Sequence, residues 1–314
     1  MLGYIIRRLA AALLVSLGVC FLTFSAIHFS PGEIAETVTR SGFVFDQDPP
    51  ADAVEATALR YGLNNPFWVR FAGWLLPLLR GDFGVSYSYN IPVMTVLLPK
   101  LANTLELGFA ALLAAILIGI LTGAIAGIHQ GGIFDRANGI LSLALVSSPS
   151  FCLGLGLIIL FSIYLRILPV SGKETPVSIV LPALTQTLGM APVIFQMTRG
   201  SVIDLKNQEF IKMAKAKGLP PGMMITRHYL KNTAIPLITV IASQAGHMLG
   251  GSVVVESVFG WPGVGKLLID SIKSKDVPVL QCCVLVIALG YSLVNFLADL
   301  GYGAADPRIR AGKT

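Results

Sequence analysis

The stretch that decides the fold lies between two long apolar segments and reads Asn207-Gln208-Glu209-Phe210-Ile211-Lys212-Met213-Ala214-Lys215-Ala216-Lys217-Gly218. Its alanines and lysines favour helix, Gly218 suits a left-handed helix end, and Pro220-Pro221 prevents simple continuation. From Arg199 to Lys231 the chain carries seven Lys or Arg residues against two acids. Because basic loops between membrane spans belong on the cytoplasmic side, we predict a short, basic, cytoplasmic helix-turn-helix here.

The composition indicates a polytopic membrane protein. Of 314 residues, 54% are hydrophobic and 13% are charged, which is too apolar for a water-soluble domain. The net charge of +6 comes from loops between apolar runs, so membrane topology explains it better than nucleic-acid binding does. The cysteines lie in apolar runs without metal-ligand spacing: Cys20, Cys152, Cys282 and Cys283. We interpret them as packed thiols and define no metal site.

The alternation of apolar and polar segments predicts an all-α membrane protein with six transmembrane helices and both termini cytoplasmic. The expected parts are an N-terminal transmembrane helix at 1–29, an extracytoplasmic loop or subdomain at 30–100, a five-helix core at 101–305 that contains the basic loop 199–231, and a cytoplasmic tail at 306–314. A cleaved signal peptide is the competing interpretation of the N-terminus. Its apolar run is longer than usual for a signal peptide, and no convincing A-x-A site follows.

The predicted core consists of five spans, and prolines are expected to break two of them. Its five spans cover about 102–128, 139–165, 177–197, 235–255 and 276–301. Ser147-Ser148-Pro149-Ser150 predicts a kink in the second of these, where hydroxyls can satisfy the freed backbone groups. Pro182 and Pro192 are expected to interrupt the third.

Three glycines in the span at 102–128 are spaced four residues apart: Gly119, Gly123 and Gly127. This spacing places them on one helix face, where small residues let two helix backbones approach closely. The partner helix is expected either within this chain or in a second subunit.

Polar and sulfur-containing side chains in and after the span at 235–255 are candidates for a transport pathway or gate: Gln244, His247, Met248, Glu256 and Trp261. Polar groups at bilayer depth are costly and usually face the protein interior or a water-filled cavity. Interhelical hydrogen bonding is the alternative for Gln244 and His247.

Residues Gly260 to Lys266 satisfy the G-x-x-x-x-G-K pattern of a phosphate-binding loop. Leu267 stands where that motif needs Ser or Thr for magnesium, and no buried strand leads into the segment. The predicted topology also places it outside the cell. We therefore predict that it does not bind ATP.

Four groups of residues, spread over the chain, match the motifs of one family. They are Glu209-Phe210 with Ala214–Leu219 and Leu230–Pro236; Tyr61–Pro66 with Trp74-Leu75 and Gly81–Ser86; Glu256 with Phe259–Gly265; and Asp306–Arg310. Together they resemble the permease subunits of ABC importers for dipeptides, oligopeptides and nickel. One departure is Lys212-Met213-Ala214, which replaces the family's Glu-Ala-Ala, although a basic residue there is usual in the peptide and nickel branch.

The resemblance implies the type I ABC importer permease fold in a bacterial inner membrane. It implies that the loop 199–231 forms a coupling helix that binds the ATPase, through Glu209, Lys212, Ala214, Ala216, Gly218 and Leu219. It also implies a second homologous permease subunit, two ABC ATPase subunits and an extracytoplasmic solute-binding protein. ATP and magnesium would then bind the partner subunits, and this chain would carry neither a cofactor nor ATPase activity.

The resemblance leaves the solute open between metal chelates and peptides. We favour nickel or another metal chelate, because the pattern from Glu55 to Trp74 and the pair Gln281-Cys282 resemble the nickel and metallophore branch slightly more. Soft side chains that could make transient contacts with a transition metal, without forming a defined ligand set, are His247, Met248, Cys282 and Cys283. A dipeptide, oligopeptide or glutathione permease is the alternative. In other classes, an ion-coupled secondary transporter would need internal repeats or intramembrane acids, and a membrane hydrolase would need a base partner for a nucleophile, neither of which is evident.

Overall fold

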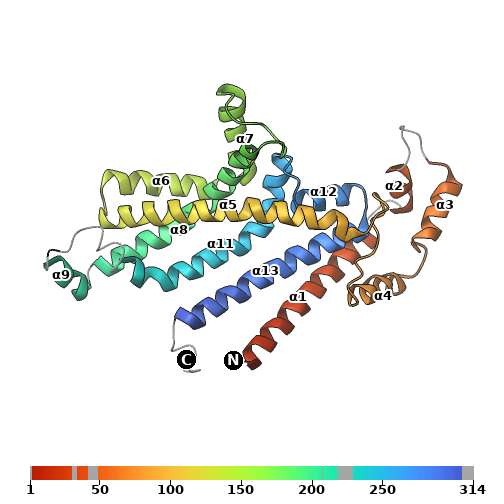
Figure 1. Ribbon diagram of the computed structural model, residues 1–314, viewed down its shortest axis with the longest axis horizontal. Helices are drawn as coiled ribbons and strands as arrows, with labels where there is room; N and C mark the ends of the chain where they lie inside the picture. The colour runs from red at the N-terminus through yellow and green to blue at the C-terminus, as the bar shows by residue number, and fades with distance from the viewer. Residues whose placement is uncertain are drawn as a thin grey trace. The chain divides into compact units, whose positions relative to one another are not determined.

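The computed structural model describes residues 2–29, 34–41, 49–206, 208–216, 218 and 229–305, and the regular secondary structure of these residues is helical, apart from an isolated β-bridge between Val85 and Pro92. The helices are α1 (Leu2–His28), α2 (Ile34–Ser41), α3 (Ala51–Arg60), α4 (Phe67–Leu78), α5 (Val93–Ile128), α6 (Ile133–Ser147), α7 (Ser150–Leu157), α8 (Val180–Lys206), α9 (Glu209–Ala216), α11 (Leu230–Val258), α12 (Val264–Lys273) and α13 (Val277–Ala305) (Figure 1). A π-helical turn, Ile158–Tyr164, follows α7, and a 3₁₀ turn, Pro176–Ile179, precedes α8. The predicted all-α class is confirmed.

Four helical segments are long and apolar enough to cross a membrane: Val93–Ile128, Pro176–Lys206, Pro236–Val258 and Val277–Leu297. The bent pair of α6 with α7 and its π-helical turn adds a fifth if it is one span. The structure therefore supports four to five of the six predicted spans among the described residues. The first span, at α1, stays a prediction.

The segment predicted as one kinked span at 139–165 is instead two helical pieces bent by 109°. The break falls at Ser148, which has extended backbone angles (φ −88°, ψ 129°), and at Pro149. Proline disfavours helical geometry in the residue before it, so α6 ends there and α7 begins anew at Ser150.

Two other boundaries differ from the prediction. Neither Pro182 nor Pro192 interrupts α8. Pro182 lies in the first turn of the helix, where a backbone N–H would make no intrahelical hydrogen bond, so its absence costs nothing. The helix also continues through Pro192. Helix α5 begins at Val93 and passes through Pro99, earlier than the predicted start near 102. Val93 is fully buried, and this packing extends the helix beyond what local sequence suggests.

The chain forms two compact units, and the larger contains Leu105–Trp261 with the described residues from Tyr291 on. Side chains of α5, α8 and α11 form an apolar core in this unit: Ala111, Ala115, Met190, Ala191, Ile194 and Leu237. The glycine ridge of α5 packs against α8. Both helices are labelled in Figure 1. A Cβ atom added at Gly123 would lie 2.7 Å from the carbonyl oxygen of Phe195, and one at Gly119 would lie 2.7 Å from Cβ of Ile194. The ridge therefore packs within this chain.

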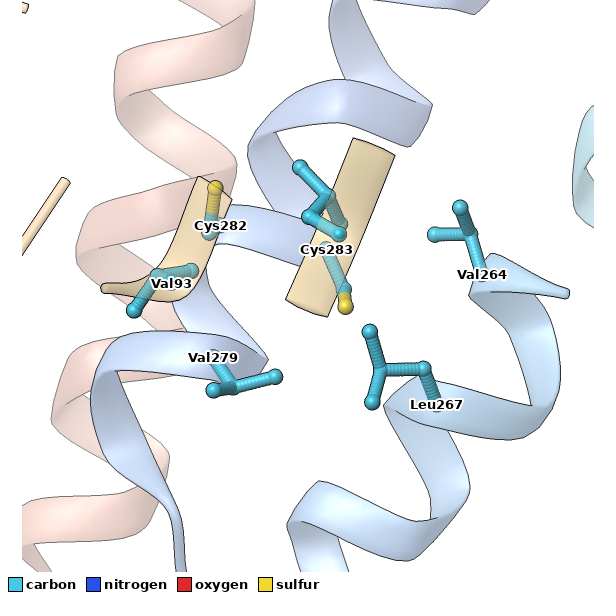
Figure 2. Close-up of a cluster of buried hydrophobic side chains, with 7 residues drawn as sticks. Val93, Val264, Leu267, Val279, Cys282 and Cys283 are labelled. Carbon is cyan, nitrogen blue, oxygen red and sulfur yellow. The ribbon is translucent and has the colours of Figure 1, made fainter. Parts of the chain in front are cut away.

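The smaller unit contains Leu2–Thr104 and Pro262–Gly290. Side chains from α5, α12 and α13 form its core, as Figure 2 shows: Val93, Leu97, Val264, Leu267, Val279, Cys282 and Cys283. Cys20, Cys282 and Cys283 are buried free thiols, which confirms the packing interpretation for these three, whereas Cys152 is exposed.

A buried carboxylate joins the loop after α4 to the start of α13. Asp276 is 1% exposed and accepts hydrogen bonds from the Ser86 hydroxyl at 2.5 Å and from the Tyr87 and Ser88 N–H groups at 3.1 Å each. Two glycines with positive φ, Gly81 (83°) and Gly84 (76°), shape the approach to this loop. Burial raises the pKa of the Tyr87 phenol to about 12, so the phenol is neutral at physiological pH.

We predict that Gly123→Ala lowers the free energy of unfolding by about 1–3 kcal/mol, because the new methyl group has no space between α5 and α8. Gly189→Ala is the matched control, since it lies in α8 with no atom within 4 Å of an added Cβ. Denaturant titration in mixed micelles measures both. Equal stability of the two variants would contradict the close approach.

Candidate coupling helix and gate

The predicted basic helix is present as α9, Glu209–Ala216. Glu209 in its first turn is favourably placed against the helix dipole. Gly218 has φ +70°, which confirms the predicted left-handed residue after the helix. The side chains of Lys212 and Ala214, and all of Leu219, lie outside the described residues.

One face of α9 packs against the end of α8. Ile211 is fully buried and clusters with Val202 and Tyr229, with Ile128 and Leu205 alongside. This contact joins α9 to the ends of α5, α8 and α11. The short helix is thus fixed to the core rather than suspended in a loop.

The opposite face of α9 is exposed. Glu209, Met213 and Ala216 are all exposed, and Met213 is 62% exposed. Their spacing of four and three residues places them on one side of the helix. We define these three residues as the α9 outer face. An exposed methionine between a carboxylate and a small residue suits binding of another protein.

An ion pair that was not predicted from the sequence joins α6 to α8 near the end of α8 that contacts α9. Asp135, in the first turn of α6, is 3% exposed and accepts hydrogen bonds from Arg199 Nε and, at 2.9 Å, from Arg199 Nη2. It also accepts the Gly131 N–H at 2.8 Å. Lys206 Nζ donates to the carbonyl oxygen of Ile128 at 3.1 Å. Arg199 and Lys206 of α8, whose charge indicated only membrane topology in the sequence, therefore also connect α8 to α6 and α5.

The pathway candidates of α11 differ in how far they are buried. Gln244 is 9% exposed, and Met248 lies over Gly108 of α5, where an added Cβ would lie 2.4 Å from its sulfur. His247, by contrast, is exposed. Gln244 and Met248 thus pack inside the chain, and His247 alone of the three faces outward.

Glu256 and Trp261 belong to a buried cluster at the far end of α11 from α9. Glu256 is fully buried, Trp261 is 1% exposed, and the Trp261 N–H donates to the Glu256 carbonyl oxygen at 2.9 Å. Lys173 Nζ lies 5.1 Å from the centroid of the Trp261 ring and forms an ion pair with Glu106. Trp261 therefore packs against one partner of a charged pair, and its role at a gate stays a prediction.

The geometry of 260–266 excludes a phosphate-binding loop. The helix α11 leads into it instead of a strand, and the first N–H of α12, from Val264, donates to Thr104 Oγ1 at 2.8 Å. Asn103 Nδ2 donates to the Pro262 carbonyl oxygen at 2.9 Å. The side chains of Thr104 and Asn103 thus form hydrogen bonds with the backbone of this turn, a role that was not predicted from the sequence.

Long apolar helices around a tightly packed α5–α8 pair, with a short basic helix docked at one end, define a multi-pass membrane protein. The chain belongs to the family described as binding-protein-dependent transport system inner membrane component, whose model matches residues 115–311. The predicted family is confirmed.

Similar proteins cover the whole chain. The dipeptide transport system permease protein DppB of Alkalihalophilus pseudofirmus is 34% identical over 340 residues, covering 99% of this chain and 100% of that protein. The glutathione transport system permease protein GsiC of Shigella flexneri is 34% identical over 312 residues, covering 99% of each. GsiC of Salmonella choleraesuis is 35% identical over the same coverage.

The fold also resembles a chain of the MetNI methionine ABC transporter in an inward-facing conformation. The TM-score is 0.57 at 18% sequence identity, with 68% of this chain and 97% of that chain covered. This likeness concerns the fold alone. As a member of its family, the chain is a permease subunit without ATPase activity of its own and a component of the inner membrane.

We predict a coupling energy of about 1–3 kcal/mol between Asp135 and Arg199, because their paired hydrogen bonds involve a buried carboxylate. A double-mutant cycle of Asp135→Ala and Arg199→Ala, read as unfolding free energy in micelles, measures it. The exposed pair Glu36 and Arg40 is the control and should give about 0.5 kcal/mol or less. A coupling no larger than that control would show that the pair contributes nothing specific.

Proposed function

We propose that this chain is one of two permease subunits of an ATP-driven importer of short peptides. The observation that carries the proposal is its similarity, along its whole length, to dipeptide and glutathione permeases. The proposed assembly adds a second homologous permease, two ABC ATPase subunits and an extracytoplasmic binding protein. Both termini are cytoplasmic in this proposal, ATP and magnesium bind the ATPase subunits, and this chain binds no cofactor.

In the proposed mechanism, the α9 outer face binds the ATPase. Closure of the ATPase dimer on ATP displaces α9, and Ile211 transmits the displacement to Val202 of α8. Helix α8 is continuous for 27 residues, about 40 Å, so it carries the motion across the membrane. The solute cavity then opens outward, and hydrolysis restores the inward-facing state. ATP drives this change only to the extent that it binds the two states differently.

Most of the side chains considered as soft contacts for a metal are better explained as packing residues. Cys282 and Cys283 are 2% and 0% exposed in an apolar cluster, and Met248 lies against Gly108. Among the described residues, no group of three or more His, Cys, Asp or Glu side chains could hold a metal ion. Together with the named relatives, this favours the peptide alternative over nickel.

His247 is the pathway candidate that the proposal retains. It lies on α11 between Pro236 and Val258, a segment apolar enough to span the membrane, yet its side chain is exposed on the single chain. A polar imidazole at that depth is costly against lipid. A solute cavity shared with the second permease gives it a polar environment.

The proposal predicts that a strain lacking this gene becomes resistant to a toxic dipeptide and retains normal uptake of radiolabelled nickel. Both measurements are made in parallel, and complementation with the intact gene should restore sensitivity. Loss of nickel uptake with unchanged peptide sensitivity would reject peptides and restore the metal assignment. An unchanged phenotype after removal of the ATPase gene would instead favour a secondary transporter.

A further inference from the structure

Helix α4 is an apolar helix in a segment predicted to lie outside the membrane. Arg70 is the only charged residue among its twelve, whereas α2 and α3 in the same segment carry both acids and bases. At about 18 Å it is too short to cross a hydrocarbon core of about 30 Å. Its composition therefore suits neither bulk water nor a transmembrane position.

One side of α4 packs against the C-terminal half of α1 (Figure 1). The ring centroids of Phe67 and Phe71 lie 5.2 Å and 5.4 Å from that of Phe24. Arg70 Nη1 lies 3.0 Å from His28 Nδ1, and its guanidinium carbon lies 5.8 Å from the Phe24 ring centroid. The one charge of the helix therefore faces α1, not outward.

The other side of α4 is an exposed apolar stripe. No residue of the helix is buried. Trp68 is 68% exposed, Val69 56%, Leu76 59%, and Leu79 at the helix end 72%, with Ala72 exposed between them. Spacings of three and four residues place them on one face. We call these residues the α4 stripe.

The α4 stripe continues the apolar surface of α1. That helix exposes Leu13, Leu14, Val15, Leu17, Val19 and Leu22, as a lipid-facing helix does. Helix α4 packs near the C-terminal end of α1, where the largely exposed Trp68 stacks on Phe21 with 6.0 Å between the ring centroids, and Arg80 lies just beyond the last turn of α4. Tryptophan is enriched at the membrane interface, and arginine reaches from there to lipid phosphates.

We propose that α4 lies in the plane of the membrane interface, with the α4 stripe inserted among the lipid headgroups and upper acyl chains. Short helices with a broad apolar face, flanking basic groups and tryptophan bind there at a depth of about 5–10 Å. In this position α4 fixes the height of the loop that holds Asp276, because that loop follows α4 directly. The bilayer is thus the partner of this surface.

Site-directed spin labelling of the intact importer tests the proposal in nanodiscs of phosphatidylethanolamine and phosphatidylglycerol. Ala72→Cys places the label in the α4 stripe, and Ala56→Cys is the matched control on the exposed face of α3. The background is Cys152→Ala, since the other three cysteines are buried. The background without an introduced cysteine measures residual labelling.

We expect the label at position 72 to collide severalfold more with oxygen than with a nickel chelate, relative to the label at 56. The reason is that oxygen concentrates in lipid and the chelate remains in water. Equal chelate access at both positions would place the stripe in water and overturn the proposal. Protection of position 72 from both reagents would also overturn it, and would make a protein subunit the partner.

Discussion

The close approach of α5 and α8 is the contact on which the rest of the larger unit depends. In a membrane, apolar side chains gain little by leaving lipid, so helix pairs depend on tight packing. Gly119, Gly123 and Gly127 supply it, because each lies where a single added carbon atom would meet α8 at 2.7–2.8 Å. The family assignment places this pair in the inner membrane component of a transport system.

The ends of this helix pair carry the functional candidates. At one end, the Asp135–Arg199 ion pair and the Ile211 contact fix α6 and α9 to α8. At the other, Trp261 packs under Lys173 beside Glu106 of α5. In the proposed mechanism, these contacts would connect α9 with the Trp261 cluster. Permeases named for dipeptide and glutathione transport align with the chain over this whole region at 34% identity.

Local features of this fold were predictable from sequence, and long-range partners were not. The α9 helix, the left-handed Gly218 and the glycine ridge follow from residue type and spacing. The 109° bend at Pro149 did not, because proline indicates a break but not its angle. Asp135–Arg199 and Ser86–Asp276 join residues 64 and 190 positions apart, and no local pattern marks such pairs. The metal preference rested on a slight resemblance of two short segments to the nickel branch, whereas full-length relatives are named for dipeptides and glutathione, and Cys282 and Cys283 are buried.

The most direct test of this account is whether the α9 outer face binds the ATPase. Met213→Asp places a charge at the centre of that face, and Ile91→Asp makes the same kind of change at an exposed apolar residue of the predicted extracytoplasmic segment. Both variants should reach the membrane in equal amounts. The account predicts that the ATPase co-purifies with Ile91→Asp but is lost, together with peptide uptake, from Met213→Asp. Full ATPase recovery and uptake with Met213→Asp would contradict it.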